Sequence, residues 1–112
     1  MGTRYRVVIA QSAKTDVKNK KRYILEKFRY REYAENFSAK IKHAAQELDI
    51  LPMGYGTTGF IYRGYEIYMK PTNNQLLFYT IDEAEKIVTI LRVLQDGMDW
   101  EYIIGRWIEK NP

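Results

Sequence analysis

The densest run of apolar positions lies at residues 87–94, where six of eight residues are aliphatic. A run that is apolar on both faces, bounded by an acidic turn and by Asp-Gly, predicts a central strand covered on both sides. Strand alternation places one set of side chains on the same face: Val88, Ile90, Arg92 and Leu94. Arg92 is then a cation on a face suited to burial, which predicts either a structural ion pair with a carboxylate or a functional role.

Two helical patterns come earlier in the chain. The first stripe has spacings of 4, 7 and 4 residues, and it is formed by Ala13, Val17, Ile24 and Phe28. Ser12 is the predicted N-cap of this helix. The second stripe predicts a helix over roughly 31–49, and it is formed by Ala34, Phe37, Ile41, Ala44 and Leu48. Two consecutive amphipathic helices with a short joint predict an antiparallel hairpin.

The remaining apolar segments are short and rich in β-branched and aromatic residues. They predict strands at 5–10, 60–63, 65–70 and 76–81. The glycine-rich stretch 53–59 predicts a connection, and Gly64 a bulge or bend. Tight turns between successive strands predict an antiparallel meander that ends in the 87–94 strand. Apolar residues at helical spacing between Trp100 and Ile108 predict a short C-terminal helix.

The order of these elements predicts an α+β fold in a single domain over residues 1–112. An N-terminal strand and a two-helix hairpin would pack on a three- to four-stranded antiparallel sheet, followed by the C-terminal helix. The chain contains no cysteine, which excludes disulfides and thiolate metal sites. No apolar run approaches the length of a membrane span, and the N-terminus does not resemble a signal peptide, so the cytoplasm is the expected compartment.

Charge is distributed unevenly along the sequence. Residues 1–31 contain ten Lys/Arg and two acidic residues, whereas residues 32–112 contain eight Lys/Arg and twelve acidic residues. The first part therefore carries a net charge of +8 and the second −4. This asymmetry suggests an acidic partner for the first third, either a nucleic acid or an acidic protein segment. The alternative is a solvated helix face without a partner.

The catalytic possibilities are few. His43 is the only histidine, the only serines, Ser12 and Ser38, are interpreted as helix cap or helix surface, and there is no cysteine. Neither a Ser-His-Asp nor a Cys-His set is therefore predicted, and no metal site or cofactor is expected. A basic and aromatic surface could still cleave RNA, with arginine stabilising the phosphorane and tyrosine or lysine moving protons. The candidate residues for that chemistry are Arg63, Lys70, Tyr79 and Arg92. The same residue types also serve ordinary protein interfaces.

Several motifs carry a resemblance to a known family. They are Tyr5-Arg-Val7, Leu77-Phe-Tyr-Thr-Ile-Asp82, Lys86-Ile-Val-x-Ile-x-Arg-Val-Leu94 and Gly97-Met-Asp-Trp100. In this order they resemble the RelE/ParE superfamily of bacterial toxins over roughly residues 5–104. The resemblance implies a growth-arresting toxin that is neutralised by a tightly bound antitoxin from the same operon. RelE-like members cleave messenger RNA on the ribosome, and ParE-like members poison DNA gyrase.

The sequence departs from the RelE-like pattern at several positions. Leu76 stands where an arginine is expected, and Gln95, Asp96 and Gly97 replace basic residues after the last strand. These departures favour a ParE-like toxin that inhibits DNA gyrase by binding and has no catalytic residues. A ribosome-dependent endoribonuclease is the alternative. A non-toxic module that binds nucleic acid or protein is a second alternative.

The resemblance also leads to site predictions. A cognate antitoxin is expected to bind the groove between helix and sheet, in a toxin–antitoxin hetero-oligomer without membrane contact. The residues predicted to bind the antitoxin are Tyr65, Ile67, Trp100 and Trp107. Those predicted to bind the target, gyrase or the ribosome with its mRNA, are Lys18, Lys21, Arg22 and Arg92.

Overall fold

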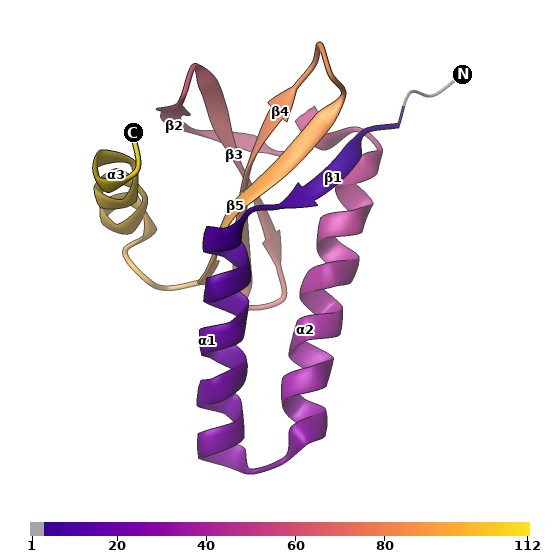
Figure 1. Cartoon of the computed structure of the whole chain (residues 1–112), viewed down its shortest axis with the longest axis vertical. Helices are drawn as coiled ribbons and strands as arrows, with labels where there is room; N and C mark the ends of the chain where they lie inside the picture. The colour runs from indigo at the N-terminus through magenta and orange to yellow at the C-terminus, as the bar shows by residue number, and fades with distance from the viewer. Residues whose placement is uncertain (1–3) are drawn as a thin grey trace.

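A computed structural model describes residues 4–112 (Figure 1). Its elements are β1 (Arg6–Ile9), α1 (Gln11–Phe28), α2 (Arg31–Gln46), short 3-10 turns at Glu47–Asp49 and Pro52–Gly54, β2 (Gly56–Tyr62), β3 (Tyr65–Thr72), β4 (Gln75–Asp82), β5 (Ile87–Gln95) and α3 (Trp100–Lys110). This order confirms the predicted α+β class, with a helical hairpin, a meander and a C-terminal helix. Within the described residues, no helix is long and apolar enough to span a membrane.

The sheet has five strands in the order β1-β5-β4-β3-β2. It is mixed rather than purely antiparallel because β1 pairs with β5 in parallel, whereas β2 to β5 form the predicted antiparallel meander. β2 begins at Gly56, so part of the predicted connection 53–59 is strand. Arg63 and Gly64 form the turn between β2 and β3, both with positive φ, so the predicted bulge or bend at Gly64 is a bend.

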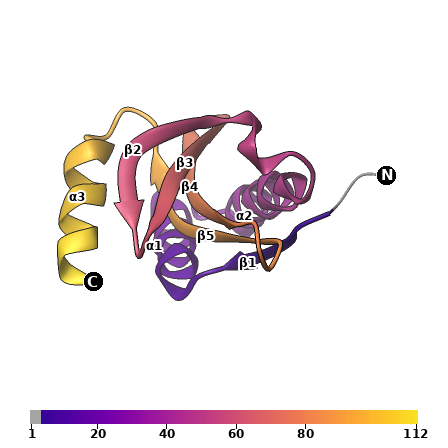
Figure 2. The same ribbon diagram turned by 90° about the horizontal axis from the view of Figure 1, so that it is seen from above.

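Helices cover both faces of this sheet (Figures 1 and 2). The α1–α2 hairpin packs on one face over a core that includes Leu48, Tyr79 and Val88. On the other face, α3 covers a second core that includes Phe78 and Leu91. Strand β5 contributes side chains to both cores, which confirms that residues 87–94 form a central strand covered on both sides.

A β-bulge in β5 changes the predicted facing of its side chains. Phe78 pairs with Arg92 and the next residue of β4 pairs with Ile90, so Leu91 is left as the extra residue. Val88 and Ile90 face the hairpin, but Leu91 packs beneath α3. The prediction that Val88, Ile90, Arg92 and Leu94 share one face is therefore wrong, because a bulge shifts the alternation by one residue.

The hairpin confirms both predicted helices but corrects two details. Ala10 rather than Ser12 is the N-cap of α1, and the Ser12 hydroxyl donates a 2.6 Å hydrogen bond to the backbone carbonyl of Leu91. Phe28, placed in the buried stripe by its spacing, is exposed. Its end of the hairpin projects beyond the sheet (Figure 1), so no sheet residue is available to cover it.

Candidate functional site

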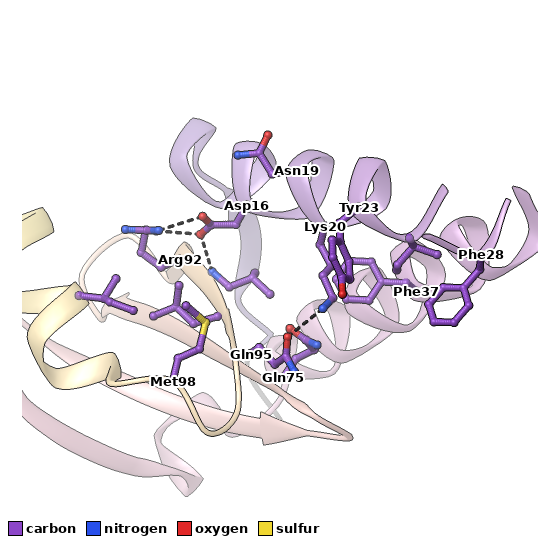
Figure 3. Close-up of a pocket in the computed structure, with 14 residues that line it drawn as sticks. Asp16, Asn19, Lys20, Tyr23, Phe28, Phe37, Gln75, Arg92, Gln95 and Met98 are labelled. Carbon is purple, nitrogen blue, oxygen red and sulfur yellow. Dashed lines mark hydrogen bonds and ion pairs between the residues drawn. The ribbon is translucent and has the colours of Figure 1, made fainter. Parts of the chain in front are cut away.

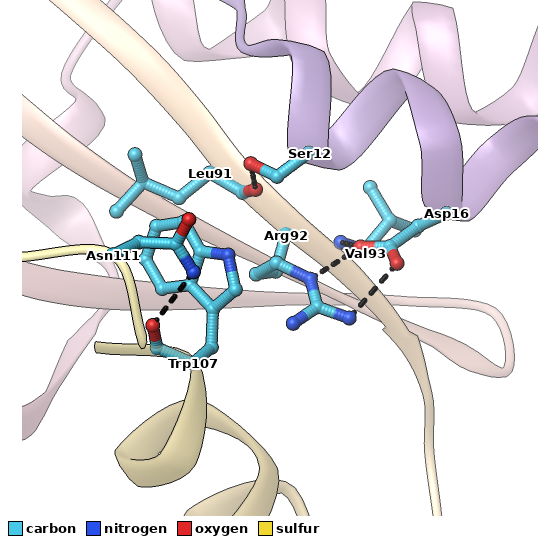
Figure 4. Close-up of polar contacts among 7 residues, drawn as sticks. All are labelled: Ser12, Asp16, Leu91, Arg92, Val93, Trp107 and Asn111. Atoms are coloured by element: carbon cyan, nitrogen blue, oxygen red, sulfur yellow. Dashed lines mark hydrogen bonds and ion pairs between the residues drawn. The ribbon is translucent and has the colours of Figure 1, made fainter. Parts of the chain in front are cut away.

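Arg92 forms an ion pair with Asp16 of α1 (Figure 4). The Arg92 Nε donates to Asp16 Oδ2 at 2.7 Å and Nη2 donates to Oδ1 at 2.9 Å. The backbone N–H of Val93 donates to the same carboxylate at 2.9 Å. Only 16% of the Arg92 side chain and 15% of the Asp16 side chain are exposed. The cation predicted on β5 therefore has a carboxylate partner, in a bidentate and largely buried geometry.

The bulge at Leu91 explains why Arg92 reaches this partner. It gives Arg92 a position at the margin of the sheet, where α1 and α3 both approach β5 (Figure 4). The guanidinium carbon lies 6.0 Å from the ring centre of Trp107 on α3, within the range of a cation–π contact. Arg92 thus connects the two helices that cover opposite faces of the sheet.

A groove of about 660 Å³ extends from this ion pair along α1 (Figure 3). Its apolar lining comes from both helices of the hairpin, the end of β5 and the start of α3: Ile24, Phe28, Phe37, Leu94, Met98 and Ile103. Lys20 stands in one wall, where its ammonium donates to Gln95 Oε1 at 2.8 Å and lies 5.1 Å from the ring centre of Tyr23. The groove therefore combines an apolar lining with one ammonium group, that of Lys20, because Asp16 neutralises Arg92.

The basic residues predicted to bind the target do not lie together: three are on one side of α1, and Arg92 of β5 lies on the other side of that helix. Lys18, Lys21 and Arg22 line a separate depression of about 450 Å³ that faces away from the ion pair. Lys21 lies 3.7 Å from Glu35 of α2 and links the two helices. Arg92 lies on the groove side, so these four residues do not form one continuous patch.

The candidate nuclease residues each have a structural partner. Lys70 is buried, and its ammonium donates to the carbonyl of Ala44 at 2.8 Å and to Glu47 Oε1 at 2.9 Å. These bonds tie β3 to the C-terminal end of α2, where free carbonyls favour a cation. Glu47 remains half-exposed, and the Lys70 ammonium lowers the pKa of its carboxyl.

Tyr79 and Arg63, two further members of this set, bind different partners from those of Lys70. The Tyr79 ring is fully buried, its hydroxyl donates to the carbonyl of Pro52 at 2.6 Å, and burial raises its pKa above the usual value. Arg63 lies in the β2–β3 turn, and its guanidinium donates to the backbone carbonyl of Pro112 at 3.1 Å. Arg92 is held by Asp16 on a different edge of the fold.

The family described as "ParE toxin of type II toxin-antitoxin system, parDE" matches residues 7–100. The chain belongs to this ParE toxin family. It is therefore a type II toxin of the RelE/ParE superfamily, as the resemblance implied. A search of curated proteins gave no match.

Solved structures with the same fold include toxins from three organisms. The Pseudomonas aeruginosa chromosomal ParDE system matches with a TM-score of 0.66 and 14% identity, covering 85% of this ParE-family chain and 99% of the other. The Mycobacterium tuberculosis RelBE2 complex matches with a TM-score of 0.58 and 19% identity, and the match covers 86% of this chain and 95% of the other. The archaeal RelE–RelB complex from Pyrococcus horikoshii matches with a TM-score of 0.51 and 19% identity, and the match covers 83% of this chain and 96% of the other. At these identities the likeness concerns the fold.

The residues predicted to bind an antitoxin fall into two groups in this ParE toxin. Tyr65 is exposed, and it lines a hollow of about 510 Å³ together with Trp107. Its hydroxyl donates to Asp82 Oδ2 at 3.2 Å, which raises the pKa of the phenol. Ile67 is fully buried in the core beneath α3, where Trp100 also packs, its ring centre 5.5 Å from that of Phe78. The structure therefore brings Tyr65 and Trp107 to one hollow, buries Ile67 in the core and leaves Trp100 partly buried against that core.

Some features of the toxin were missed from the sequence. Asp16 was not identified as the partner of Arg92, although an isolated cation in an apolar strand indicated that a carboxylate was needed. The groove residues Lys20 and Tyr23 were also missed, because they join the site only through the packing of α1 beside β5. In the described part of the chain, no cluster of His, Cys, Asp or Glu could hold a metal ion.

Proposed function

We propose that this ParE toxin arrests growth by binding and inhibiting DNA gyrase, and that its own side chains perform no catalytic step. The observation that carries the proposal is that three of the four candidate nuclease groups are engaged within the fold, whereas Arg63 is exposed and bonded only to the backbone oxygen of Pro112. A general acid or base must come within hydrogen-bond reach of the substrate proton. Tyr79 is buried and donates inward, whereas Lys70 is held between two acceptors and Arg92 is paired with Asp16.

The surface around the end of β5 also favours binding over RNA cleavage. Asp96 and Asp99 flank the turn between β5 and α3, and Glu101 lies in the first turn of α3. Carboxylates close to a scissile phosphate raise the energy of the dianionic transition state, which a nuclease must lower. A protein target with suitably placed basic groups would instead be attracted to them.

We further propose a cognate antitoxin as the stable partner. The similar structures from M. tuberculosis and P. horikoshii are complexes of a Rel toxin with its antitoxin, which supports the same assembly for this chain. The hollow lined by Tyr65 and Trp107 is the expected binding site for an antitoxin segment, because partly exposed aromatic rings commonly anchor interfaces. Hydrogen exchange of the complex should show protection of β3 and α3. Protection confined to other elements would contradict this location.

Two purified assays distinguish the candidate targets. The toxin should inhibit gyrase-catalysed supercoiling of relaxed plasmid, and prior mixing with its antitoxin should abolish that inhibition. In parallel, ribosomes programmed with a defined mRNA should show no new cuts in the presence of toxin. Ribosome-dependent mRNA cleavage without gyrase inhibition would refute the proposal and assign the toxin to the RelE-like nucleases.

A further inference from the structure

The free end of the α1–α2 hairpin exposes a group of aromatic side chains. The exposed fractions are 48% for Tyr23, 47% for Phe28, 59% for Tyr30 and 48% for Tyr33. The hairpin end projects beyond the sheet (Figure 1), so neither hydrophobic core reaches it. Single exposed apolar residues are ordinary, but several large rings on one short segment mark an interaction surface.

Three of these rings form a packed unit, which we name the hairpin knob: Phe28, Tyr30 and Tyr33. The Tyr33 ring packs edge-to-face against Phe28, with 5.9 Å between ring centres, and against Tyr30, with 5.4 Å. Such contacts hold the rings in place before any partner arrives. The knob is therefore a preorganised cluster of exposed rings at the end of the hairpin, and such a cluster suits an apolar pocket on a partner.

The turn beside the hairpin knob holds an arginine in a backbone conformation that glycine adopts more easily. Arg29 joins the helices in the left-handed conformation, with φ 60° and ψ 18°. Glycine adopts this conformation without strain, whereas a residue with a Cβ does not. The turn places the exposed Arg29 guanidinium at the end of the hairpin, next to the knob. Arg31 begins α2 one residue further on, and neither arginine forms an ion pair within residues 4–112.

We propose that the hairpin knob inserts into an apolar pocket rimmed by carboxylates on the toxin's target protein. The aromatic rings would fill the pocket while Arg29 and Arg31 pair with its acidic rim. This inference rests on the proposed function in one respect, that the target is a protein such as gyrase. It adds the part of the toxin that contacts the target and the chemistry of the surface that receives it.

A protein pocket suits the knob better than nucleic acid does. Bases stack on open aromatic faces, but the rings of the knob already engage one another edge-to-face. The antitoxin hollow lies near α3 and the β2–β3 turn, at the other end of the molecule from the hairpin end (Figure 1).

The test uses the full-length toxin with three variants and purified gyrase. The first variant replaces the three rings of the knob by serine, and the matched control is Ile61→Ser, an exposed apolar residue on β2 (60% exposed). Loss of anchoring aromatics should weaken gyrase binding by about 100-fold or more, whereas the control should bind as the wild type does. Both variants should keep the wild-type affinity for the antitoxin.

The third variant, Arg29→Gly, separates binding from folding. Removing the Cβ from a left-handed position should raise the melting temperature by about 2–4 °C. Loss of the guanidinium should nevertheless weaken gyrase binding several-fold, most strongly at low salt. A variant that is more stable but binds less tightly cannot be explained by damage to the fold. Unchanged affinity for gyrase in both knob variants would overturn the proposal.

Growth arrest after induction distinguishes failure of the knob from failure of the proposed target. If wild-type toxin arrests growth without binding gyrase, the gyrase proposal fails. The knob proposal then stands if arrest is lost in the ring variant and retained in Ile61→Ser at equal soluble levels, and it falls if both arrest growth. Binding of labelled DNA that depends on the knob, with unchanged gyrase affinity, would also overturn it in favour of nucleic acid.

Discussion

The ion pair between Arg92 and Asp16 should be a major contributor to the stability of this toxin. We expect both Arg92→Ala and Asp16→Ala to lower the free energy of unfolding. Three hydrogen bonds converge on the Asp16 carboxylate, from Nε and Nη2 of Arg92 and from the N–H of Val93. Either substitution leaves a largely buried charged group without its partner, and Asp16→Ala also removes the acceptor of the Val93 N–H.

The magnitude follows from burial and chain length. Breaking a fully buried pair costs about 3–5 kcal/mol, and the residual exposure of 15–16% reduces this to about 2–3 kcal/mol. An unfolding entropy of about 2.1 cal/mol/K per residue gives about 0.24 kcal/mol/K for 112 residues. The melting temperature should therefore fall by about 8–13 °C for each single variant. The exposed pair of Lys86 and Glu83 is a matched control, and its removal should cause a much smaller change.

Calorimetry and urea unfolding of the two single variants and the double variant measure the effect and the coupling. The double variant should be less destabilised than the sum of the singles by about 1–2 kcal/mol, because each single variant leaves a partner unpaired. Gyrase inhibition measured well below the melting temperature should persist in Arg92→Ala. An unchanged melting temperature together with lost gyrase inhibition would refute this reasoning and make Arg92 a target-contacting residue.

Three further predictions concern the polar contacts of the sheet with the end of α2 and the 3-10 turns that follow it. Lys70→Met should lower stability by about 1–3 kcal/mol in urea unfolding, since the carbonyl of Ala44 loses a buried donor. Tyr79→Phe should lower it by about 1 kcal/mol by the same measurement, because the carbonyl of Pro52 loses its bond to the phenol. Because the folded state lowers the pKa of Glu47 from 4.5, this group adds stability that is present above pH 4.5 and lost as pH falls through the folded pKa. Melting temperatures between pH 3 and 6 should therefore fall less steeply in Glu47→Gln than in the wild type.

Much of the fold follows from local patterns in the sequence. The stripe from Ala34 to Leu48 predicted one helix over roughly 31–49, because burial against one sheet face imposes helical spacing; the structure divides this range into α2 and a 3-10 turn at Glu47–Asp49. The apolar run at 87–94 predicted a doubly covered strand, because a strand that is buried on both faces needs apolar residues at successive positions. The resemblance to the RelE/ParE superfamily was confirmed by the family match over residues 7–100.

Other features depend on tertiary contacts that no local pattern specifies. The bulge at Leu91 arises from the register between β4 and β5, so alternation alone misplaced the residues after Ile90. Phe28 has the spacing of a core residue, but the sheet is too short to cover its end of α1 (Figure 1). The candidate nuclease residues were grouped by chemical type, which contains no information about whether Lys70 or Tyr79 reaches solvent.

The parallel pairing of β1 with β5 has a consequence for how the toxin is made. Residues 6–9 pair with residues 87–90, and α1 packs against the same last strand. The hairpin can form early from local contacts, but contacts between segments so distant in sequence form slowly. During synthesis, α1 therefore emerges long before the strand that completes its groove. The Arg92–Asp16 pair can close only after β5 has been translated, so nascent chains that end before β5 lack the finished surface along α1.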